Sequence, residues 1–322
     1  MHANDTNEGC RHAANSFHSQ ALVDQCRLVG VQTTITMKSG FVALIGRSNV
    51  GKSTLLNALV GSKVAIITPK PQTTRQAIRG IVHDPRGQIV FVDTPGVFEK
   101  SRDALTESLN REVKNAMGGI DAIVYVVDPT RAVGPEEHHT YAMVQASPTP
   151  KIMAINKSDL SDRKKPFQFE FERMGEKMDA VINISALRGS NLAPLLDKLF
   201  EVLPEGEPFY PEFQLTDMEN KKWVEELIRE KVFIQMQQEV PYTITVTLDE
   251  MDKRPDGTIY IKARILTTDK RYKKMLIGAG ASKIKEMGYT ARKELETVLQ
   301  AKVFLDLEVE VDANWVGRET HH

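Results

Sequence analysis

Residues 46–53 read Gly-Arg-Ser-Asn-Val-Gly-Lys-Ser and match the pattern GxxxxGK[ST]. An apolar strand is predicted just before this stretch, at residues 41–45, and an amphipathic helix just after it, at residues 53–60. Glycines let backbone N–H groups approach phosphate oxygens closely, and the N-terminus of the following helix adds partial positive charge. The stretch therefore predicts a phosphate-binding loop in an α/β fold, with Lys52 on the β- and γ-phosphates and Ser53 on Mg²⁺. The residues expected to contact the nucleotide here are Gly46, Asn49, Val50, Gly51, Lys52, Ser53 and Thr54.

The chain around this loop alternates short apolar strands with amphipathic stretches. Residues 104–117 carry apolar side chains at helical spacing. Such alternation is typical of a mostly parallel sheet covered by helices on both faces, and it predicts an α/β domain over residues 38–204. The expected strands lie at residues 41–45, 89–92, 120–127, 151–155 and 180–184.

Two further segments have the residue types that a magnesium and γ-phosphate site requires. Asp93-Thr94-Pro95-Gly96 ends the strand at 89–92, so that the carboxylate can hold a Mg²⁺-bound water and the Gly96 N–H can bind the γ-phosphate. The segment 69–75 reads PKPQTTR, and a loop threonine that ligates Mg²⁺ is expected there, with Thr74 favoured over Thr73. We therefore expect Mg²⁺ at Ser53, Thr74 and Asp93, and hydrolysis to depend on Lys52, Thr74 and Gly96.

The base is expected at the ends of the next two strands. Asn156-Lys157-Ser158-Asp159 has the pattern NKxD, and the Asp159 carboxylate can accept hydrogen bonds from N1–H and the 2-amino group of guanine, which adenine lacks. The Lys157 stem would pack on the base. Ser185 and Ala186 close the following strand, where the Ala186 N–H would meet the guanine O6. Together these motifs predict a GTP- and GDP-binding GTPase.

A proline-rich stretch, LPEGEPFYP at residues 203–211, separates this domain from a second one. The elements expected after it are a helix at 221–238, strands at 242–248 and 258–266, helices at 271–277 and 282–299, and a strand at 303–311. This α-β-β-α-α-β order predicts an α+β domain. The full division is an extension at 1–37, the α/β domain at 38–204, a linker at 205–212, the α+β domain at 213–315 and a tail at 316–322.

Composition sets limits on the class of protein. The chain of 322 residues is 41% hydrophobic and 26% charged, and no apolar run reaches the roughly 18 residues of a membrane span, so an integral membrane protein is excluded. Its two cysteines, Cys10 and Cys26, are too few for a disulfide scaffold, and the first 37 residues lack an apolar signal-peptide core. We therefore expect a cytoplasmic protein.

The net charge of −1 conceals strong segregation of charge. Residues 253–293 sum to +9, whereas residues 205–252 sum to −8 and residues 294–322 to −5. A basic block of this size can neutralise nucleic-acid phosphates. The second domain is therefore a candidate for RNA binding.

The motifs GRSNVGKST, PKPQTTR, DTPG, NKSD and SA, followed by an α-β-β-α-α-β domain, resemble the Era family of bacterial Ras-like GTPases over Met37 to about Trp315. The resemblance implies a GTPase domain followed by a type II KH domain, with GTP or GDP and Mg²⁺ as cofactors. It also implies 16S rRNA near its 3′ end and the 30S ribosomal subunit as partners, a role in small-subunit assembly, and a monomer. Peripheral association with the cytoplasmic face of the inner membrane is left open.

KH domains clamp single-stranded nucleotides with a GxxG loop between two helices. The corresponding residues here are Gly278, Ala279, Gly280 and Ala281, so that alanine stands where the family has glycine. Because alanine does not favour a positive φ, we expect either that Gly278 and Gly280 preserve the close backbone approach or that the grip on RNA is weaker. The basic residues expected to neutralise phosphates are Lys270, Arg271, Lys273, Lys274, Lys283 and Lys285.

Ras-type enzymes place a glutamine after the DxxG glycine, but this chain has Val97 there, so slow intrinsic hydrolysis is expected. Asn49 occupies the position at which related GTPases help to coordinate K⁺, and K⁺ is a candidate additional cofactor. Two alternatives stay open. One is a related GTPase that acts in tRNA modification, and the other is an RNA-binding assembly module for which GTP is only a structural ligand.

Overall fold

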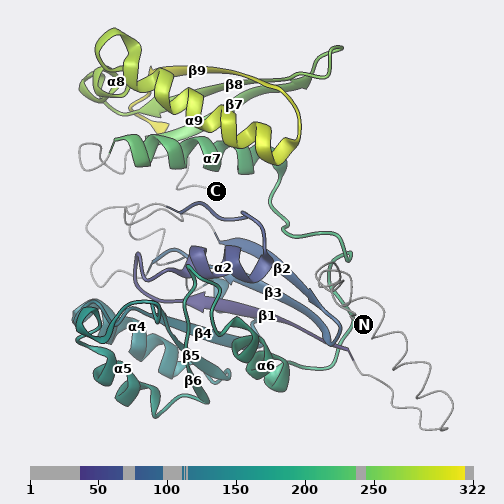
Figure 1. The fold of residues 1–322 in the computed structure, drawn as a ribbon, viewed down its shortest axis with the longest axis vertical. Coiled ribbons are helices and arrows are strands. Elements are labelled where there is room, and N and C mark those ends of the chain that lie inside the picture. Colours follow the sequence, from purple (N-terminus) through teal and green to yellow (C-terminus); the bar gives the residue numbers. More distant parts are fainter. Residues whose placement is uncertain are drawn as a thin grey trace, which may run out of the picture.

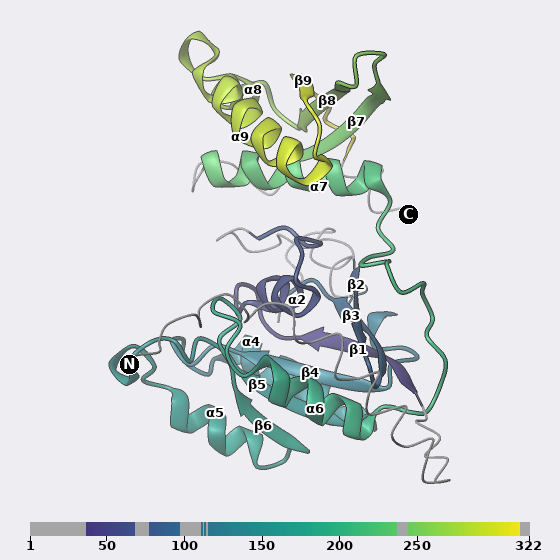
Figure 2. The same cartoon turned by 45° about the vertical axis from the view of Figure 1, so that its right-hand side comes forward.

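The computed structural model describes residues 37–67, 77–96, 111, 113, 115–236 and 244–315. These residues form two domains that lie one above the other, joined by a segment that runs along the side of the first (Figures 1 and 2). The described residues do not include Thr73, Thr74, Val97, the two cysteines or most of the helix expected at 104–117.

The first domain is built on a six-stranded sheet with the order β2-β3-β1-β4-β5-β6. All neighbours pair in parallel except β2, which is antiparallel to β3. The expected mostly parallel α/β sheet is thus confirmed. Its strands are β1 (Lys38–Ile45), β2 (Ile78–Asp84), β3 (Gly87–Asp93), β4 (Ala122–Val127), β5 (Lys151–Ile155) and β6 (Ala180–Asn183).

Helices cover both faces of this sheet, because side chains alternate along each strand. Val42 and Leu44 of β1 point to one face, where they share a core with α2 and α6. Ala43 and Ile45 point to the other face, which α4 and α5 cover. The helices are α2 (Lys52–Val60), α4 (Pro135–Ala146), α5 (Gln168–Gly175) and α6 (Leu192–Val202).

The segment between the domains is attached to the free edge of β2. The Ile81 N–H donates to the Leu215 carbonyl at 2.9 Å, and the Thr216 hydroxyl donates to the Arg79 carbonyl at 2.7 Å. Arg79 also pairs with Asp217 at 2.7 Å. Covering an edge strand satisfies its backbone groups and prevents pairing with other chains. The contacts therefore extend beyond the linker expected at 205–212, whose boundaries stay a prediction.

The second domain has the element order expected from the sequence. Its sheet has the order β7-β8-β9, with β7 and β8 antiparallel and β8 and β9 parallel. Helices α7 and α9 pack on its core face through side chains such as Ile228 and Leu295, both fully buried. The elements are α7 (Asn220–Gln235), β7 (Ile244–Lys253), β8 (Ile259–Thr267), α8 (Lys270–Ile277), α9 (Ser282–Leu299) and β9 (Val303–Val311).

Candidate nucleotide and RNA sites

The predicted nucleotide residues come together at one edge of the parallel sheet. β1, β3, β5 and β6 run in the same direction and end at this edge, where the phosphate loop, Asp93, Asn156 and Ser185 follow them. Ligands of open α/β sheets bind outside the carboxyl ends of the strands. The arrangement is that of one continuous site assembled from four separate segments.

Lys52 occupies the centre of the phosphate loop. Its ammonium donates to the carbonyls of Gly46 and Arg47, both at 2.9 Å, and the residue is only 6% exposed. Burial lowers the Lys52 pKa to about 8, although the charges of Asp93 and Glu137 act in the opposite direction. A buried cation held by two carbonyl oxygens of the loop is well prepared to receive a phosphate.

The residues described for the magnesium site are adjacent. The Ser53 hydroxyl donates to Asp93 Oδ2 at 2.6 Å, and Asp93 is fully buried. A hydroxyl and a carboxylate are the hard oxygen ligands that Mg²⁺ prefers, so the pair fits this ion. Within the described residues there is no cluster of three or more His, Cys, Asp or Glu side chains that could hold a metal. The nucleotide phosphates would therefore have to complete the coordination.

Asn156 joins the base-binding segments to the phosphate loop. Its Nδ2 donates to the Val50 carbonyl at 2.8 Å, and its Oδ1 accepts from the N–H groups of Lys157 and Ala186 at 2.8 and 2.9 Å. The Ala186 N–H expected to meet guanine O6 is thus engaged by Asn156. The contact of the Ala186 N–H with guanine stays a prediction. This contact requires that the N–H be shared between Asn156 and guanine or released by Asn156.

The groups that would recognise guanine are held in place by their neighbours. The Ser185 hydroxyl donates to Asp159 Oδ1 at 2.6 Å, and this hydrogen bond lowers the pKa of the Asp159 carboxyl. Lys157 pairs with the buried Asp128, which extends its stem across the site. Asp159 therefore stays an anion and keeps its second oxygen as an acceptor.

The phosphate loop is also anchored from α4, which the sequence did not indicate. Arg47 donates to the Ala132 carbonyl at 3.1 Å and pairs with Glu137 at 3.4 Å. Glu137 is 1% exposed and accepts a short hydrogen bond from the Tyr125 hydroxyl. Burial raises the pKa of Glu137, even though Tyr125 and Arg47 oppose the shift. The only signal in the sequence was the arginine inside the glycine-rich motif.

The loop between α8 and α9 adopts left-handed backbone conformations in spite of its altered sequence. Gly278, Gly280 and Ala281 have φ values of 72°, 58° and 63°. The expectation that alanine would not take a positive φ is therefore wrong. The glycine-like shape of the loop is retained, and the strain is concentrated on Ala281.

Basic side chains gather around this loop. Lys270, Arg271 and Lys274 on α8 and Lys285 on α9 are exposed, while Lys273 and Lys283 are half-buried. Within the described part of the chain, Lys273, Lys274 and Lys285 form no ion pair, so their charges are available to a phosphate backbone. The expected basic residues are thus brought to one place.

Polar contacts connect the two domains just ahead of residues 68–76, which contain Thr74. Lys63 pairs with Glu230 of α7 at 2.5 Å and with Glu294 of α9. Glu230 also accepts from the Ile67 N–H at 3.0 Å, and the Trp223 indole donates to the Lys63 carbonyl at 3.2 Å. We call Lys63, Ile67, Trp223, Glu230 and Glu294 the interdomain contact. Helix α7 lies on the side of the second domain that faces the first, as both views show (Figures 1 and 2).

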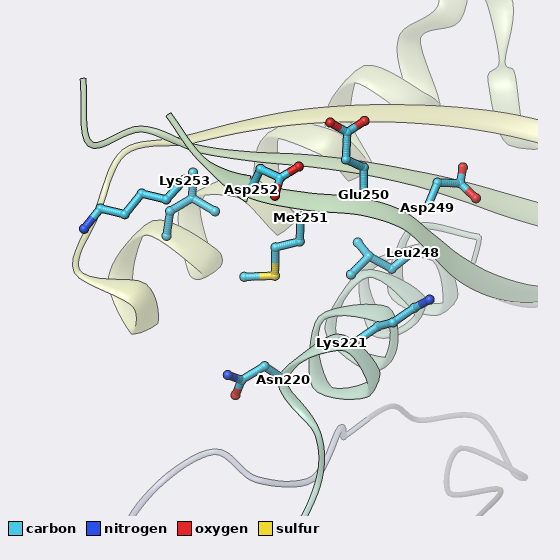
Figure 3. A pocket seen from close by; sticks show the side chains of 9 residues that line it. Asn220, Lys221, Leu248, Asp249, Glu250, Met251, Asp252 and Lys253 are labelled. Atoms are coloured by element: carbon cyan, nitrogen blue, oxygen red, sulfur yellow. The ribbon is translucent and has the colours of Figure 1, made fainter. Parts of the chain in front are cut away.

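A separate cavity of about 470 Å³ lies between the start of α7 and β7. Leu248 and Met251 face the first turn of α7, at Asn220 and Lys221, while Glu250 points away (Figure 3). Several lining residues are acidic, which is unfavourable for a nucleic-acid backbone. The cavity therefore belongs to neither site described above.

None of the helices in the described residues combines the length and hydrophobicity needed to cross a bilayer.

Two family models match the chain. Residues 41–157 match a model described as a 50S ribosome-binding GTPase, and residues 239–316 match a KH domain model. The sequence is 44% identical to GTPase Era of Halothermothrix orenii, over 88% of this chain and 97% of that protein. It is 41% identical to GTPase Era of Thermotoga petrophila, over 87% of this chain and 94% of that protein.

Solved structures give the same result over the same length. The fold matches a point variant of Aquifex aeolicus Era bound to GDP·AlF4⁻ with a TM-score of 0.82 and 35% identity, covering 88% of this chain and 97% of that one. It matches Era in complex with MgGDPNP and nucleotides 1506–1542 of 16S ribosomal RNA with a TM-score of 0.82 and 36% identity, at the same coverage. The similarity spans both domains and the segment between them.

Proposed function

This chain belongs to the Era family of GTPases, and on this basis we propose that it binds 16S rRNA near the 3′ end under the control of GTP and assists 30S assembly. The observation that carries the proposal is the presence, in one chain, of guanine-nucleotide motifs at one edge of a parallel sheet and of a KH loop flanked by basic side chains. A relative of the same architecture is known in complex with both MgGDPNP and a 16S rRNA fragment.

At the nucleotide site, the chain's own residues provide binding and orientation. Lys52 holds the β- and γ-phosphates, Asp159 accepts from guanine, and the Gly96 N–H meets the γ-phosphate. Ser53 and Asp93 would hold Mg²⁺ together with Thr74, and this ion, when bound, neutralises charge on the phosphates. The adjacency of Ser53 and Asp93 supports this assignment.

Hydrolysis is proposed to be slow, since Val97 has no side-chain group that could orient the attacking water. Asn49, exposed and in a left-handed conformation in the phosphate loop, is proposed to help bind K⁺ beside the phosphates. Its test is GTP turnover in KCl and in NaCl. Faster turnover in KCl supports the ion, and equal rates count against it.

At the KH loop, the six basic residues Lys270, Arg271, Lys273, Lys274, Lys283 and Lys285 are proposed to neutralise RNA phosphates. Gly278, Ala279, Gly280 and Ala281 are proposed to let the backbone approach the RNA closely. The left-handed conformation of this loop supports the assignment.

The two sites are proposed to communicate through the interdomain contact. Glu230 holds both the Lys63 ammonium and the Ile67 N–H, and residue 67 lies directly before the segment that contains Thr74. A nucleotide that rearranges this segment would change how firmly α7 is held, and the KH domain carries α7. The effect of nucleotide on RNA binding follows from this connection.

Three further assignments complete the proposal. The chain is proposed to act as a monomer in the cytoplasm, and its association with the inner membrane is proposed to be peripheral. Cell fractionation and sedimentation test these points. Recovery of a stable dimer, or of protein that detergent alone releases from membranes, would contradict them.

Footprinting of the 30S subunit tests the proposed partner. With a GTP analogue, the wild-type chain is expected to protect nucleotides near the 3′ end of 16S rRNA, and Lys274→Glu is expected to reduce that protection. Protection confined to other rRNA regions would contradict the partner.

Turnover of GTP on 30S subunits separates the rivals. If GTP turnover stays undetectable after 30S subunits are added, the result would favour the assembly module that uses GTP only as a structural ligand. Turnover stimulated by tRNA but not by 30S subunits would favour the GTPase of tRNA modification.

A further inference from the structure

Ser48, at the tip of the phosphate loop, has a hydroxyl group with no structural role in the described residues. Its Oγ is inaccessible to solvent and makes no hydrogen bond to any described residue. A buried hydroxyl without a partner destabilises a folded protein, so a native site that retains one calls for an explanation, such as a catalytic role or a bound ion.

The position of this hydroxyl is fixed on both sides. The Ser48 carbonyl accepts from Arg131 Nη1 at 2.8 Å, and the preceding Arg47 is anchored to the Ala132 carbonyl. On the other side lies Gly96, where an added β-carbon would collide with the hydroxyl and lie 2.7 Å from the Ser48 nitrogen. Ser48 Oγ therefore lies at the seam between the phosphate loop and the DTPG segment.

The proposed roles of Lys52 and Gly96 assign the terminal phosphate of GTP to this seam. Lys52 and the Gly96 N–H, the two groups assigned to the γ-phosphate, belong to the two segments that meet at Ser48. The side chain that follows Gly96 is apolar, since residue 97 is valine. Ser48 thus brings a hydroxyl donor to the seam from the phosphate loop.

We propose that the Ser48 hydroxyl donates a hydrogen bond to a γ-phosphate oxygen and so helps this loop to distinguish GTP from GDP. The inference rests on the proposed binding of GTP at this loop. Phosphate oxygens are strong acceptors, and a hydrogen bond to a charged group is stronger than one between neutral groups. GDP offers no oxygen at this position, so the contact is made with GTP alone.

The test is the dissociation constant of a non-hydrolysable GTP analogue and of GDP for the full chain with Mg²⁺. Ser48→Ala is expected to raise the dissociation constant of the analogue by about tenfold and to change that of GDP by less than about twofold. Ser48→Thr, which keeps the hydroxyl, is expected to restore binding of the analogue. Unchanged GDP affinity also shows that the variants are folded.

Two results would overturn the inference about Ser48 while leaving the proposed function intact. One is an alanine variant that binds the analogue as tightly as the wild type does. The other is an equal loss of both nucleotides, because that loss indicates a purely structural role. If the wild-type chain bound neither nucleotide, the proposed function itself would fail, and this inference with it.

Discussion

At the scale of single residues, Lys52 determines how the phosphate site responds to pH. Its pKa of about 8 in the nucleotide-free chain means that it is mostly charged below this pH and increasingly neutral above it. Phosphates favour the charged form, so the pKa rises on binding, and nucleotide binding above pH 8 must take up a proton.

We therefore predict that GDP affinity changes little up to about pH 7.5 and weakens above about pH 8, by at most about tenfold per pH unit. Calorimetry at about pH 8.5 in two buffers with different ionisation enthalpies measures the proton uptake directly. Identical binding enthalpies in the two buffers would contradict the assignment.

Ala281 is the second residue whose conformation gives a prediction. A non-glycine residue in the left-handed region costs about 1–2 kcal/mol, and glycine avoids this cost while losing up to about 1 kcal/mol in backbone entropy. Ala281→Gly is therefore expected to stabilise the chain by up to about 1 kcal/mol, measured by denaturant unfolding. Ala279→Gly, in the same loop, has no left-handed strain to relieve and serves as the control. Equal effects of both substitutions would contradict the account.

At the scale of elements, α7 contacts the first domain, and α9 adds Glu294 to this contact. Glu230 is 3% exposed and links Lys63 with the Ile67 N–H. Burial alone would raise the pKa of the neighbouring Glu294, but hydrogen bonds from Lys231 and Lys63 lower it below its ordinary value. The Glu294 carboxylate therefore stays charged at neutral pH, and it holds Lys63 together with Glu230.

Glu230→Gln is expected to remove the ion pair between Glu230 and Lys63. The RNA affinities of the GTP-analogue and GDP states are then expected to become nearly equal. Filter binding of a 16S rRNA fragment in both nucleotide states measures this ratio. Glu286→Gln is the matched control, since Glu286 lies on α9 and contacts Gln235 rather than the first domain. A ratio that is the same in Glu230→Gln and the wild type would count against this route of communication.

Helix α8 and the start of α9 carry the positive charge that is proposed to face RNA. Replacing Lys273 and Lys274 together by glutamate is expected to weaken binding to RNA of any sequence. It is also expected to reduce the salt slope, which is the slope of the logarithm of the binding constant against the logarithm of the salt concentration, by about 2 in magnitude. Replacing Lys164 and Lys177 together by glutamate, at exposed sites of the first domain, controls for the same change in net charge. A salt slope that equals that of the wild type would show that these lysines do not contact phosphates.

The elements also show how far the sequence alone could predict the fold. Strands such as β4 and β5 were evident because they are buried apolar runs. β2 was missed because Arg79, Gly80 and His83 interrupt its apolar pattern, and its pairing with β3 became visible only in the structure. α4 was missed for a related reason, since its buried positions include Glu137 and Thr140 rather than an apolar stripe.

The meeting of the phosphate loop, Asp93, Asn156 and Ser185 at one edge could be predicted, because each motif follows a strand end and parallel strands bring their ends together. The contacts made by Ser48, Arg47 and Glu230 could not be predicted, because each depends on a partner from a distant part of the chain. Local patterns contain no information about which distant groups meet. The left-handed Ala281 was missed because the loop geometry prevailed over the preference of the residue.

At the scale of the whole molecule, the net charge of −1 is the sum of parts with separate tasks. Within the basic block at 253–293, the lysines and arginine of α8 and the first turn of α9 flank the KH loop, while acidic residues of α7 and α9 face the first domain at Lys63. The same domain therefore carries basic groups proposed to bind RNA and acidic groups that contact the GTPase domain. We propose this arrangement as the basis for control of one site by the other.

The most direct test of this control is the affinity of the intact chain for an RNA of nucleotides 1506–1542 of 16S rRNA, measured with a GTP analogue and with GDP. A coupling of the usual size predicts binding about tenfold tighter in the analogue state. Affinities that are the same in the two nucleotide states would contradict the claim that GTP controls RNA binding.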